Sequence, residues 1–347
     1  MQPTRPRLTP AIADIRRAVR SALPAATDAP SGTDGLVLVA LSGGPDSLAL
    51  AAATAFEAPR AGLRAGAVIV DHGLQNGSAD VAAAAASHAA ALGLDPVIVR
   101  AVAVGTEGGP ESAARTARYA ALSEAAAQTG ALTVLLGHTL DDQAETVLLG
   151  LARGSGATSL HGMASRTGQY SRPLLGIRRS QTEQFCTDSG LDPWNDPQNL
   201  DPAFTRVRVR TSVLPMLERE LGPGITEALV RTADQLREDS DALDHFAEEI
   251  AEDLAQIVEA GIALPASALA ANPPALRQRL IRLAVSSEFH LTLSRAQTLE
   301  VARLATHWHG QKPLDLPGVK VERRGGLIVF TATDAGELTG VDPILEH

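Results

Sequence analysis

The stretch Leu36-Val37-Leu38-Val39-Ala40-Leu41-Ser42-Gly43-Gly44-Pro45-Asp46-Ser47 decides the fold of this chain. Its first six residues are all apolar, which predicts a parallel strand buried on both faces. Gly43 and Gly44 permit a tight turn in which backbone N–H groups approach an anion closely. Pro45 and Asp46 suit the first turn of a helix, whose N-terminus offers further N–H groups to a phosphate. We therefore predict a phosphate-binding loop made of Ser42, Gly43, Gly44, Pro45, Asp46 and Ser47, the alternative being an ordinary glycine-rich turn.

The loop lacks the lysine of common nucleotide-binding loops. The only lysines of the chain are Lys312 and Lys320, near the C-terminus, so a Walker-type loop is excluded. The Ser-Gly-Gly-x-Asp-Ser pattern resembles the pyrophosphatase-type loop (PP-loop) of enzymes that cleave ATP between its α and β phosphates. We expect ATP as a substrate, with Mg²⁺ held by Asp46, because a bare carboxylate in such a loop would repel the phosphates. A plain helix cap is the alternative role for Asp46, and both roles can coexist.

Around this loop, strand patterns alternate with helix patterns. Strands are predicted at residues 36–41, 65–70, 96–104, 131–136 and 170–175, and helices at 10–22, 47–56, 79–92, 111–128 and 142–152. This order predicts an α/β fold with a doubly wound parallel sheet. Beyond about residue 211, long helices are predicted at 225–260, 274–288 and 295–308, followed by short strands at 313–316, 319–323 and 327–331. We divide the chain into an N-terminal helix and linker (1–34), an ATP-binding domain (35–215) and a mainly helical domain (216–347).

The composition is that of a globular protein with one cysteine. At 347 residues and 45% apolar content, the chain is long enough for two or three domains. The lone Cys186 excludes a disulfide framework and a cysteine-based zinc cluster. No apolar stretch approaches the roughly 20 residues needed to cross a membrane. The first 23 residues carry arginines and lack the apolar core of a secretion signal. We expect a cytoplasmic protein without membrane contact.

Arginines gather in one segment of this acidic chain. The formal net charge is −10, yet seven arginines lie between residues 166 and 210: Arg166, Arg172, Arg178, Arg179, Arg206, Arg208 and Arg210. Such a segment can attract a polyanion despite the net charge, the alternative being salt-bridged surface arginines. The three arginines of residues 206–210 alternate with valines, so they share one side of an extended backbone and spread out on a helix. Either arrangement suits a phosphate backbone.

Polar residues directly follow three of the predicted strands. The phosphate loop follows the first, Asp71 and His72 follow the second, and Gly137 and His138 follow the fourth. Because ligands of doubly wound sheets bind at the carboxyl ends of the strands, we expect all of them to line one ATP-binding crevice. Each histidine can ligate, shuttle a proton or only form a hydrogen bond at a strand end.

Two acids and two arginines on predicted helices are further candidates. Asp142 and Glu145 are three residues apart and share a helix face, where paired carboxylates can hold an amine or a metal. They also suit the helix dipole without any other role. Arg115 and Arg118 lie on one side of the helix at 111–128. They can neutralise a pyrophosphate leaving group, or Arg115 can form an ordinary surface pair with Glu111.

In this order, the motifs resemble those of the tRNA(Ile)-lysidine synthases, a family of the PP-loop (N-type ATP pyrophosphatase) superfamily. The matching segments, which cover about residues 36–215, are Ser42–Ser47, Val70–Leu74, Glu111-x-x-x-Arg115-x-x-Arg118-Tyr119, Asp141–Thr146, Arg153-Gly154-x-Gly156, His161–Met163, Arg172–Leu175, Asp196-x-x-Asn199 and Phe204-x-Arg206. Thr139 and Val207 depart from the pattern, because the family often has His and Asn there. The segment beyond residue 215 resembles the family's tRNA-binding extension in a shorter form.

The resemblance implies an adenine nucleotide alpha hydrolase-like fold and a ligase. ATP would adenylate the C2 carbonyl oxygen of the wobble cytidine in a CAU-anticodon tRNA(Ile), releasing pyrophosphate, and L-lysine would then attack C2 and expel AMP. The catalytic residues implied are Asp46, Arg115, Arg118, Asp142 and Glu145, of which the last two would bind lysine. The tRNA contacts implied are Arg153, Arg172, Arg206, Arg208 and Arg210. We predict no obligatory protein partner and leave a homodimer open.

Three other readings compete with this one. One is a PP-loop tRNA thiolase. Thiolases of this type look to use cysteine pairs or iron–sulfur ligands, and the single Cys186 argues against such a protein. An ammonia-dependent PP-loop ligase has no evident need for the arginine-rich segment. A noncatalytic tRNA-binding module could lose Asp46, Asp142 and Glu145 without penalty, and this chain has all three.

Overall fold

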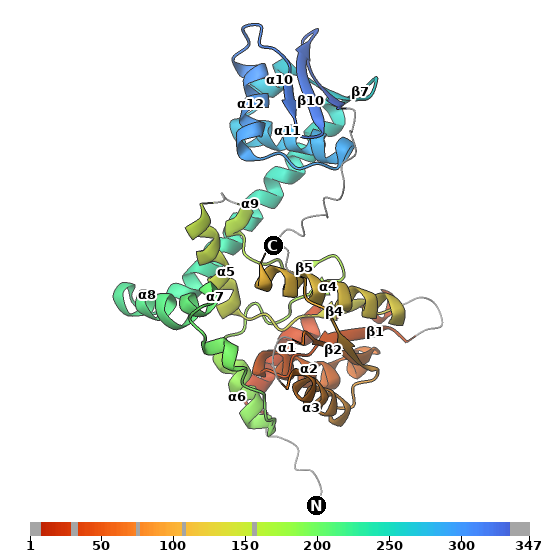
Figure 1. Ribbon diagram of the computed structural model, residues 1–347, viewed down its shortest axis with the longest axis vertical. Coiled ribbons are helices and arrows are strands. Elements are labelled where there is room, and N and C mark those ends of the chain that lie inside the picture. Colours follow the sequence, from red (N-terminus) through yellow and green to blue (C-terminus); the bar gives the residue numbers. More distant parts are fainter. Residues whose placement is uncertain (1–7, 29–33, 74–76, 106–108, 155–157, 334–347) are drawn as a thin grey trace, which may run out of the picture. The chain divides into compact units, whose positions relative to one another are not determined.

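The structure is a computed structural model that describes residues 8–28, 34–73, 77–105, 109–154 and 158–333 (Figure 1). It divides into two compact units, Met1–Asp234 and Gln235–His347. The division falls within helix α9 (Ile225–Leu254). Within the described ranges, no helix combines the length and the apolar character that a membrane span requires.

A six-stranded sheet organises the first unit, in the order β3-β2-β1-β4-β6-β5. The four leading strands are parallel: β1 (Leu36–Ala40), β2 (Arg64–Asp71), β3 (Val97–Ala101) and β4 (Thr133–Leu135). β6 (Tyr170–Ser171) continues the parallel order, and β5 (Arg166–Thr167) pairs with it antiparallel. The expected doubly wound parallel sheet is therefore confirmed, with strands shorter than predicted after residue 96.

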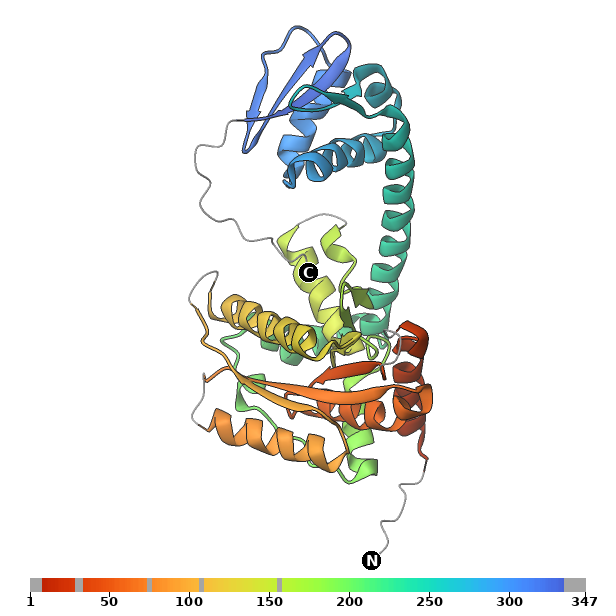
Figure 2. The ribbon, with the colours of Figure 1, turned by 90° about the vertical axis from the view of Figure 1, so that its right-hand side faces the viewer.

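Helices cover both faces of this sheet. Their bounds are α1 (Pro10–Ala22), α2 (Pro45–Glu57), α3 (Ser78–Ala91), α4 (Pro110–Thr129), α5 (Leu140–Arg153) and α6 (Arg179–Ser189). Val37 and Val39 of β1 face a core that includes residues of α1, α2, α3 and α6. Leu36 and Leu38 face the opposite way, toward residues of α4. Figure 2 shows α3 and α4 on opposite faces of the sheet. The continuous apolar run of β1 follows from this burial on both sides.

The strand order places the site. From β1 the chain moves to β2 and β3 on one side, and then returns to β4 on the other side of β1. The order therefore reverses between β1 and β4, and such a switch point opens a crevice at the carboxyl ends of the strands. The loop after β1 is the predicted phosphate loop, and the loop after β4 carries Gly137 and His138.

Two charged side chains join α1 to α2 beneath the sheet. Glu57 at the end of α2 is only 1% exposed, and its carboxylate accepts hydrogen bonds from Arg20 Nε at 2.7 Å and Nη2 at 3.0 Å. Because a buried carboxylate is costly unless it is paired, this bidentate contact fixes how α1 docks. It lies in a part of the unit that carries none of the candidate site residues.

The sequence reading missed α6. No helix was predicted between residues 153 and 225, but Arg179–Ser189 form one, capped at its start by a hydrogen bond from the Arg178 N–H to Gln181 Oε1 and ended by Gly190 in the left-handed conformation. Four further helical segments follow: a 3₁₀ turn (Pro197–Leu200), α7 (Thr205–Arg208), a π-helical turn (Val209–Val213) and α8 (Leu214–Leu221). The alternating arginines of residues 206–210 thus lie on helical backbone, not on a strand.

In the described part of the second unit, an antiparallel sheet in the order β7-β8-β11-β10-β9 packs with the C-terminal part of α9 and with α10, α11 and α12. The bounds are β7 (Gln256–Val258), β8 (Gly261–Pro265), α10 (Ala266–Ala271), α11 (Pro274–Phe289), α12 (Arg295–Thr306), β9 (Leu314–Leu316), β10 (Val319–Arg324) and β11 (Leu327–Ala332). The helix predicted at 225–260 was too long. It ends at Leu254, because the segment after it turns back as a hairpin whose β8 pairs with β11.

Candidate active site

The loop after β1 is folded as a phosphate cradle. Gly43 has a φ of +88°, which favours glycine, and Gly44 precedes α2 without a side-chain cap. Ser47 ties the loop together: its hydroxyl donates to Gly44 O at 3.0 Å and accepts from the Ser42 N–H at 3.2 Å. The Trp194 N–H, in the segment after α6, donates to Gly43 O at 3.0 Å. The N–H groups at the start of α2 therefore have no side-chain cap and are available to a phosphate.

Gly137, directly after β4, lies against this loop. A Cβ atom at this position would lie 3.1 Å from Ser47 N and 3.2 Å from the backbone carbon of Asp46. These neighbours are backbone atoms at the start of α2, which cannot rotate away. Glycine at 137 therefore sets the contact between the two loops that border the switch point.

We expect Gly137→Ala to displace the phosphate loop. Overpacking against backbone costs about 1–3 kcal/mol, and the start of α2 has to shift by a few tenths of an ångström. The Michaelis constant for ATP should rise about tenfold, and urea unfolding should show a loss of stability in this range. Gly93→Ala is not a suitable control because its φ is +80°, whereas Gly176, with nothing within 4 Å of a Cβ, is suitable. A Michaelis constant for ATP equal to that of Gly176→Ala would refute the packing role of Gly137.

The second loop leads into α5, where Asp142 is held in place. Thr139 is the N-cap of α5: its N–H and its hydroxyl both donate to Asp142 Oδ2 at 2.8 Å, and its Oγ1 accepts from the Asp142 N–H at 3.4 Å. This capping box uses one carboxylate oxygen of Asp142 and leaves Oδ1 directed away from the helix end. The departure of Thr139 from the family pattern thus gives α5 its cap.

Glu145, one turn further along α5, is completely buried among arginines. Arg210 binds it with two hydrogen bonds, Nε to Oε1 at 2.6 Å and Nη2 to Oε2 at 3.1 Å. Arg206 Nε lies 3.8 Å from Oε2, and its Nη2 donates to Thr146 at 3.3 Å. Arg206 and Arg210 share this face because they are four residues apart on helical backbone.

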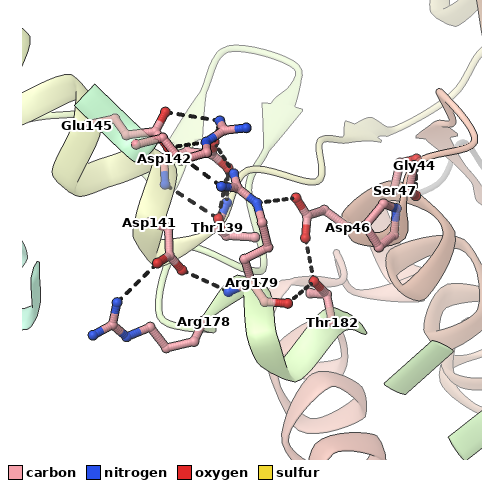
Figure 3. A network of polar contacts seen from close by, with 12 residues as sticks. Gly44, Asp46, Ser47, Thr139, Asp141, Asp142, Glu145, Arg178, Arg179 and Thr182 are labelled. Carbon is pink, nitrogen blue, oxygen red and sulfur yellow. Dashed lines mark hydrogen bonds and ion pairs between the residues drawn. The ribbon is translucent and has the colours of Figure 1, made fainter. Parts of the chain in front are cut away.

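Arg179, at the start of α6, joins the two loops. Its guanidinium donates to Asp46 Oδ2 at 3.2 Å and to Asp142 Oδ1 at 2.7 Å, and its Nη1 lies 3.5 Å from Glu145 Oε1. Figure 3 shows its side chain between Asp46 and the start of α5. Asp141 anchors the backbone below, accepting from the Arg179 N–H at 2.8 Å and from Arg178 Nη1 at 3.0 Å. The three predicted acids therefore meet around one arginine.

Burial and pairing shift the pKa values of Asp46 and Asp142 in opposite directions. Burial raises the pKa of the Asp46 carboxyl, although Arg179 and a hydrogen bond from Thr182 oppose the change. Burial would also raise the pKa of Asp142, but Arg179 and the hydrogen bonds from Thr139 hold it below its usual value. Asp142 is thus a carboxylate at neutral pH, and Arg179 is its cationic partner.

His138 follows Gly137 and is enclosed. Burial lowers its pKa to about 4, since the neighbouring Asp142 only partly compensates. Its Nδ1 is shielded from solvent and has no hydrogen-bond partner in the parts of the chain that the structure describes. His138 is therefore neutral at physiological pH, which excludes a role as a resident cation.

The lowered pKa of His138 predicts a loss of stability in mild acid. The unfolded state takes up this proton below about pH 6.5 and the folded state only near pH 4, so the free energy of unfolding falls as the pH falls through this window. The loss attributable to this group is about 3 kcal/mol. In His138→Asn, the difference in unfolding free energy between pH 7 and pH 4 should shrink by this amount. The control His245→Asn changes a histidine that is 67% exposed, and an equal effect there would contradict the assignment.

Arg115 and Arg118 lie on α4, on the side of β2. Arg118 Nε donates to His72 Nε2 at 3.3 Å, and Asp71 Oδ1 accepts from the Gly73 N–H at 3.0 Å. The Arg115 guanidinium stacks 4.9 Å from the ring centre of Tyr119 and is exposed. Arg118 thus contacts His72, in the loop that follows β2. Glu111 lies in the first turn of α4, and the motif residues Leu74 and Gly156 lie outside the described residues.

The five arginines predicted to contact tRNA fall into different environments. Arg153 is exposed, and Arg208 is exposed while donating to the carbonyls of Pro202 at 2.6 Å and Ala203 at 2.9 Å. Arg172 is only 6% exposed and donates to Ala164 O and Thr167 Oγ1. As described above, Arg206 and Arg210 pair with the acids of α5. Arg172 is therefore buried, whereas the paired side chains of Arg206 and Arg210 are still 33% and 27% exposed, and a tRNA contact of these arginines stays a prediction.

Asp46 fits one coordination position of a nucleotide-bound Mg²⁺. Mg²⁺ in such sites is usually held by one or two carboxylates together with phosphate oxygens. Asp46 lies in the first turn of α2, beside the uncapped N–H groups of the phosphate loop. Over the described residues, no group of three or more His, Cys, Asp or Glu side chains is placed to hold a metal without such oxygens.

Arg179 and Thr182 are the functional candidates that the sequence reading missed. Arg179 appeared there only as one of seven arginines in a basic segment. Its contact with Asp46 joins residues 133 apart in sequence, so no local spacing reveals it. The available signal was Gly190 at the end of an 11-residue run, which is typical of a helix C-terminus.

Comparisons with known proteins show the family of this chain. A family model described as a PP-loop domain matches residues 18–217. The tRNA(Ile)-lysidine synthase of Leifsonia xyli subsp. xyli is 63% identical over 302 residues, which are 87% of this chain and 91% of that protein. The chain belongs to the tRNA(Ile)-lysidine synthases. The synthase of Thermobifida fusca is 54% identical over 326 residues, covering 93% of this chain and 98% of that one. This lysidine synthase family member also matches the model of a TilS substrate binding domain at residues 264–328.

A solved structure supports the fold of this lysidine synthase family member. The U34-tRNA thiolase NcsA from Methanococcus maripaludis, with its 4Fe–4S cluster, superposes with a TM-score of 0.53. The match covers 66% of this chain and 80% of the thiolase, at 21% identity. At this identity the likeness shows a shared PP-loop fold and nothing of the reaction.

Proposed function

We propose that this protein ligates L-lysine to C2 of the wobble cytidine in the CAU anticodon of tRNA(Ile), with ATP as the activating substrate. The observation that carries the proposal is the meeting of Asp46 with Asp142 and Glu145 around Arg179. Arg179 lies 3.2 Å from Asp46 and 2.7 Å from Asp142. A phosphate-binding half and an amine-binding half thus share one site, as a reaction that joins an amine to an activated carbonyl requires.

In the first step, the C2 carbonyl oxygen of cytidine attacks the α phosphorus of ATP. A P–O bond forms to the cytidine oxygen, and the bond to the β phosphate breaks to release pyrophosphate. The N–H groups of the phosphate loop and the arginines Arg115 and Arg118 would offset the charge that gathers on the leaving group. Mg²⁺, held by Asp46 and phosphate oxygens, would supply further positive charge at the phosphates.

In the second step, the ε-amine of lysine attacks C2 and AMP leaves with the former carbonyl oxygen. The free ammonium has a pKa of about 10.4, so it must lose a proton before it can attack. Asp142 and Glu145 would bind the ammonium groups of lysine, and one of them would accept this proton. Ser42, Gly43, Gly44, Pro45, Ser47, Asp71, His72, Gly137 and His138 would line the ATP site.

We propose that residues 35–215 carry the chemistry and that residues 216–347, which include the segment matching the TilS substrate binding domain, help to hold tRNA(Ile). Arg153 and Arg208 are exposed and suited to phosphate contacts. We further propose a cytoplasmic enzyme that needs no protein partner, with a homodimer left open.

Binding of tRNA should weaken steeply with salt if exposed arginines contact its backbone. The slope of log affinity against log salt is negative, and each phosphate contact that is lost makes it less steep by about 0.7–0.9. The double variant Arg153→Gln/Arg208→Gln should therefore flatten this slope by about 1.5 in filter binding with CAU-anticodon tRNA. The variant Arg219→Gln, at a position 68% exposed and paired with Glu220, is the matched control. A slope equal to that of the control would remove both arginines from the tRNA surface.

The proposed reaction predicts which substrates are needed for each product. Purified protein with ATP, CAU-anticodon tRNA and lysine should release AMP and pyrophosphate and incorporate lysine in equal amounts. An ammonia-dependent ligase is the other candidate, and it would release AMP with ammonium in place of lysine. AMP release that ignores lysine and follows ammonium would therefore overturn the proposal.

A further inference from the structure

Every carboxylate oxygen of the acids proposed to bind lysine already accepts a hydrogen bond from the protein. Asp142 Oδ1 accepts from Arg179 at 2.7 Å and Arg210 at 3.4 Å, while Oδ2 is used by Thr139. Both oxygens of Glu145 accept from Arg210. An incoming ammonium therefore finds no free carboxylate oxygen and has to displace a guanidinium.

Charges in this cluster already balance. Three carboxylates (Asp46, Asp142 and Glu145) face three guanidinium groups (Arg179, Arg206 and Arg210) at 2.6–3.8 Å. Adding a lysine ammonium leaves one surplus positive charge beside the fully buried Glu145, which is costly. Lysine binding thus requires that one of the three arginines leave its carboxylate and pair with another anion.

Arg179 is the arginine placed to make this exchange. Its guanidinium already reaches Asp46, in the first turn behind the phosphate loop. Arg206 and Arg210 contact only α5 in this cluster: Glu145, Thr146 and Asp142. The planar guanidinium of Arg179 could donate two parallel hydrogen bonds to oxygens of a triphosphate in the loop. Guanidinium groups bind phosphates best in this bidentate way. The Arg179 N–H is fixed by Asp141 at 2.8 Å, so only the side chain has to move.

We propose that Arg179 is an exchangeable counter-ion, which neutralises the lysine-binding acids until ATP binds and then turns to the phosphates, so that lysine binds after ATP. The inference rests on the proposed function, since it assigns Asp142 and Glu145 to lysine. Arg179 is in this sense a positioning residue. Linkage makes the coupling reciprocal: ATP and lysine raise each other's affinity by the same factor.

The test compares lysine affinity with and without nucleotide. We would titrate lysine calorimetrically into the full-length protein, alone and saturated with α,β-methylene ATP, which occupies the loop without being cleaved. In the wild type, the analogue should tighten lysine binding about tenfold or more, within the usual range of coupling between sites. In Arg179→Gln, lysine should bind without nucleotide nearly as tightly as the wild type does with it, and the ratio should fall to about 1.

A neighbouring arginine provides the matched control. Arg178 starts the same helix but pairs with Asp141 and Glu227, not with the acids of the site. Arg178→Gln should keep the wild-type ratio. If Arg179→Gln does not fold, Arg179→Lys replaces it: its single ammonium cannot span Asp46 and Asp142 together, so the ratio should fall at least about threefold.

Two results would overturn the inference. One is a wild-type lysine affinity that is the same with and without the analogue. The other is a wild-type ratio retained in the Arg179 variant that folds. Both are distinguishable from failure of the proposed function, in which the wild type with ATP and CAU-anticodon tRNA would incorporate no lysine at all.

Discussion

Asp142→Asn and Glu145→Gln should each lower lysine incorporation by about 10³-fold, while pyrophosphate release with ATP and CAU-anticodon tRNA continues. The reason is that the two carboxylates face the amine half of the site and not the phosphate loop. The N-cap of α5 fixes Asp142 through Thr139, and Glu145 lies one turn along the same face. Without these charges, lysine loses both its binding partner and the group that takes its proton. Labelled lysine counted in tRNA is the measurement, with pyrophosphate followed in parallel.

Stability has to be controlled in these variants, because Glu145 is fully buried and pairs with Arg210. Removing one partner of a buried pair typically costs about 3–5 kcal/mol. Glu57→Gln is the matched control: Glu57 is 1% exposed and holds Arg20 at 2.7 Å, in a part of the unit without site residues. It should lose comparable stability and keep lysine transfer. Equal loss of incorporation in Glu57→Gln, or normal incorporation in either site variant, would contradict the role of the acidic pair.

Asp46→Asn should abolish the first step and not only the second. The side chain lies in the first turn of α2 at the phosphate loop, where it would hold Mg²⁺ against the phosphates and where it pairs with Arg179 at 3.2 Å. We expect pyrophosphate release to fall by about 10³-fold, on the scale at which removed electrostatic contacts reduce rates. Lysine incorporation should fall with it, since no adenylated cytidine forms.

Cys186→Ala controls for damage to the same loop. The Cys186 thiol is buried beside it and donates to Pro45 O at 3.5 Å, and the proposed reaction assigns it no role. This variant should release pyrophosphate within about threefold of the wild type, because it creates only a small cavity. Asp46→Asn and Cys186→Ala with equal activity would show that Asp46 has no role in adenylation.

Local sequence was sufficient for the parts of the fold that local chemistry determines. The apolar run of β1, the glycines after it and Pro45 predicted a strand, a turn and a helix, and the structure has them at Leu36–Ala40 and Pro45–Glu57. α1 has its predicted bounds, Pro10–Ala22. The spacing of Asp142 and Glu145 placed them on one helix face, as found. Their roles in binding and catalysis remain predictions.

Contacts between residues that lie far apart in the sequence could not be predicted from it. The arginines between residues 166 and 210 were predicted to attract a polyanion or to form surface salt bridges, and Arg179, Arg206 and Arg210 pair with acids of the site. Nothing in the spacing of residues 46 and 179 indicates their contact. The hairpin β7–β8 was missed for a related reason: its stability comes from pairing with β11, more than 60 residues later.

The most direct test of the two-substrate site is to follow pyrophosphate, AMP and lysine together in one reaction of the wild-type protein. With ATP and CAU-anticodon tRNA but no lysine, pyrophosphate should be released, up to one per tRNA, and AMP should stay bound as adenylated cytidine. Adding lysine should then release AMP and incorporate lysine in a one-to-one ratio. Pyrophosphate release that does not need tRNA, or AMP release that does not need lysine, would contradict the account.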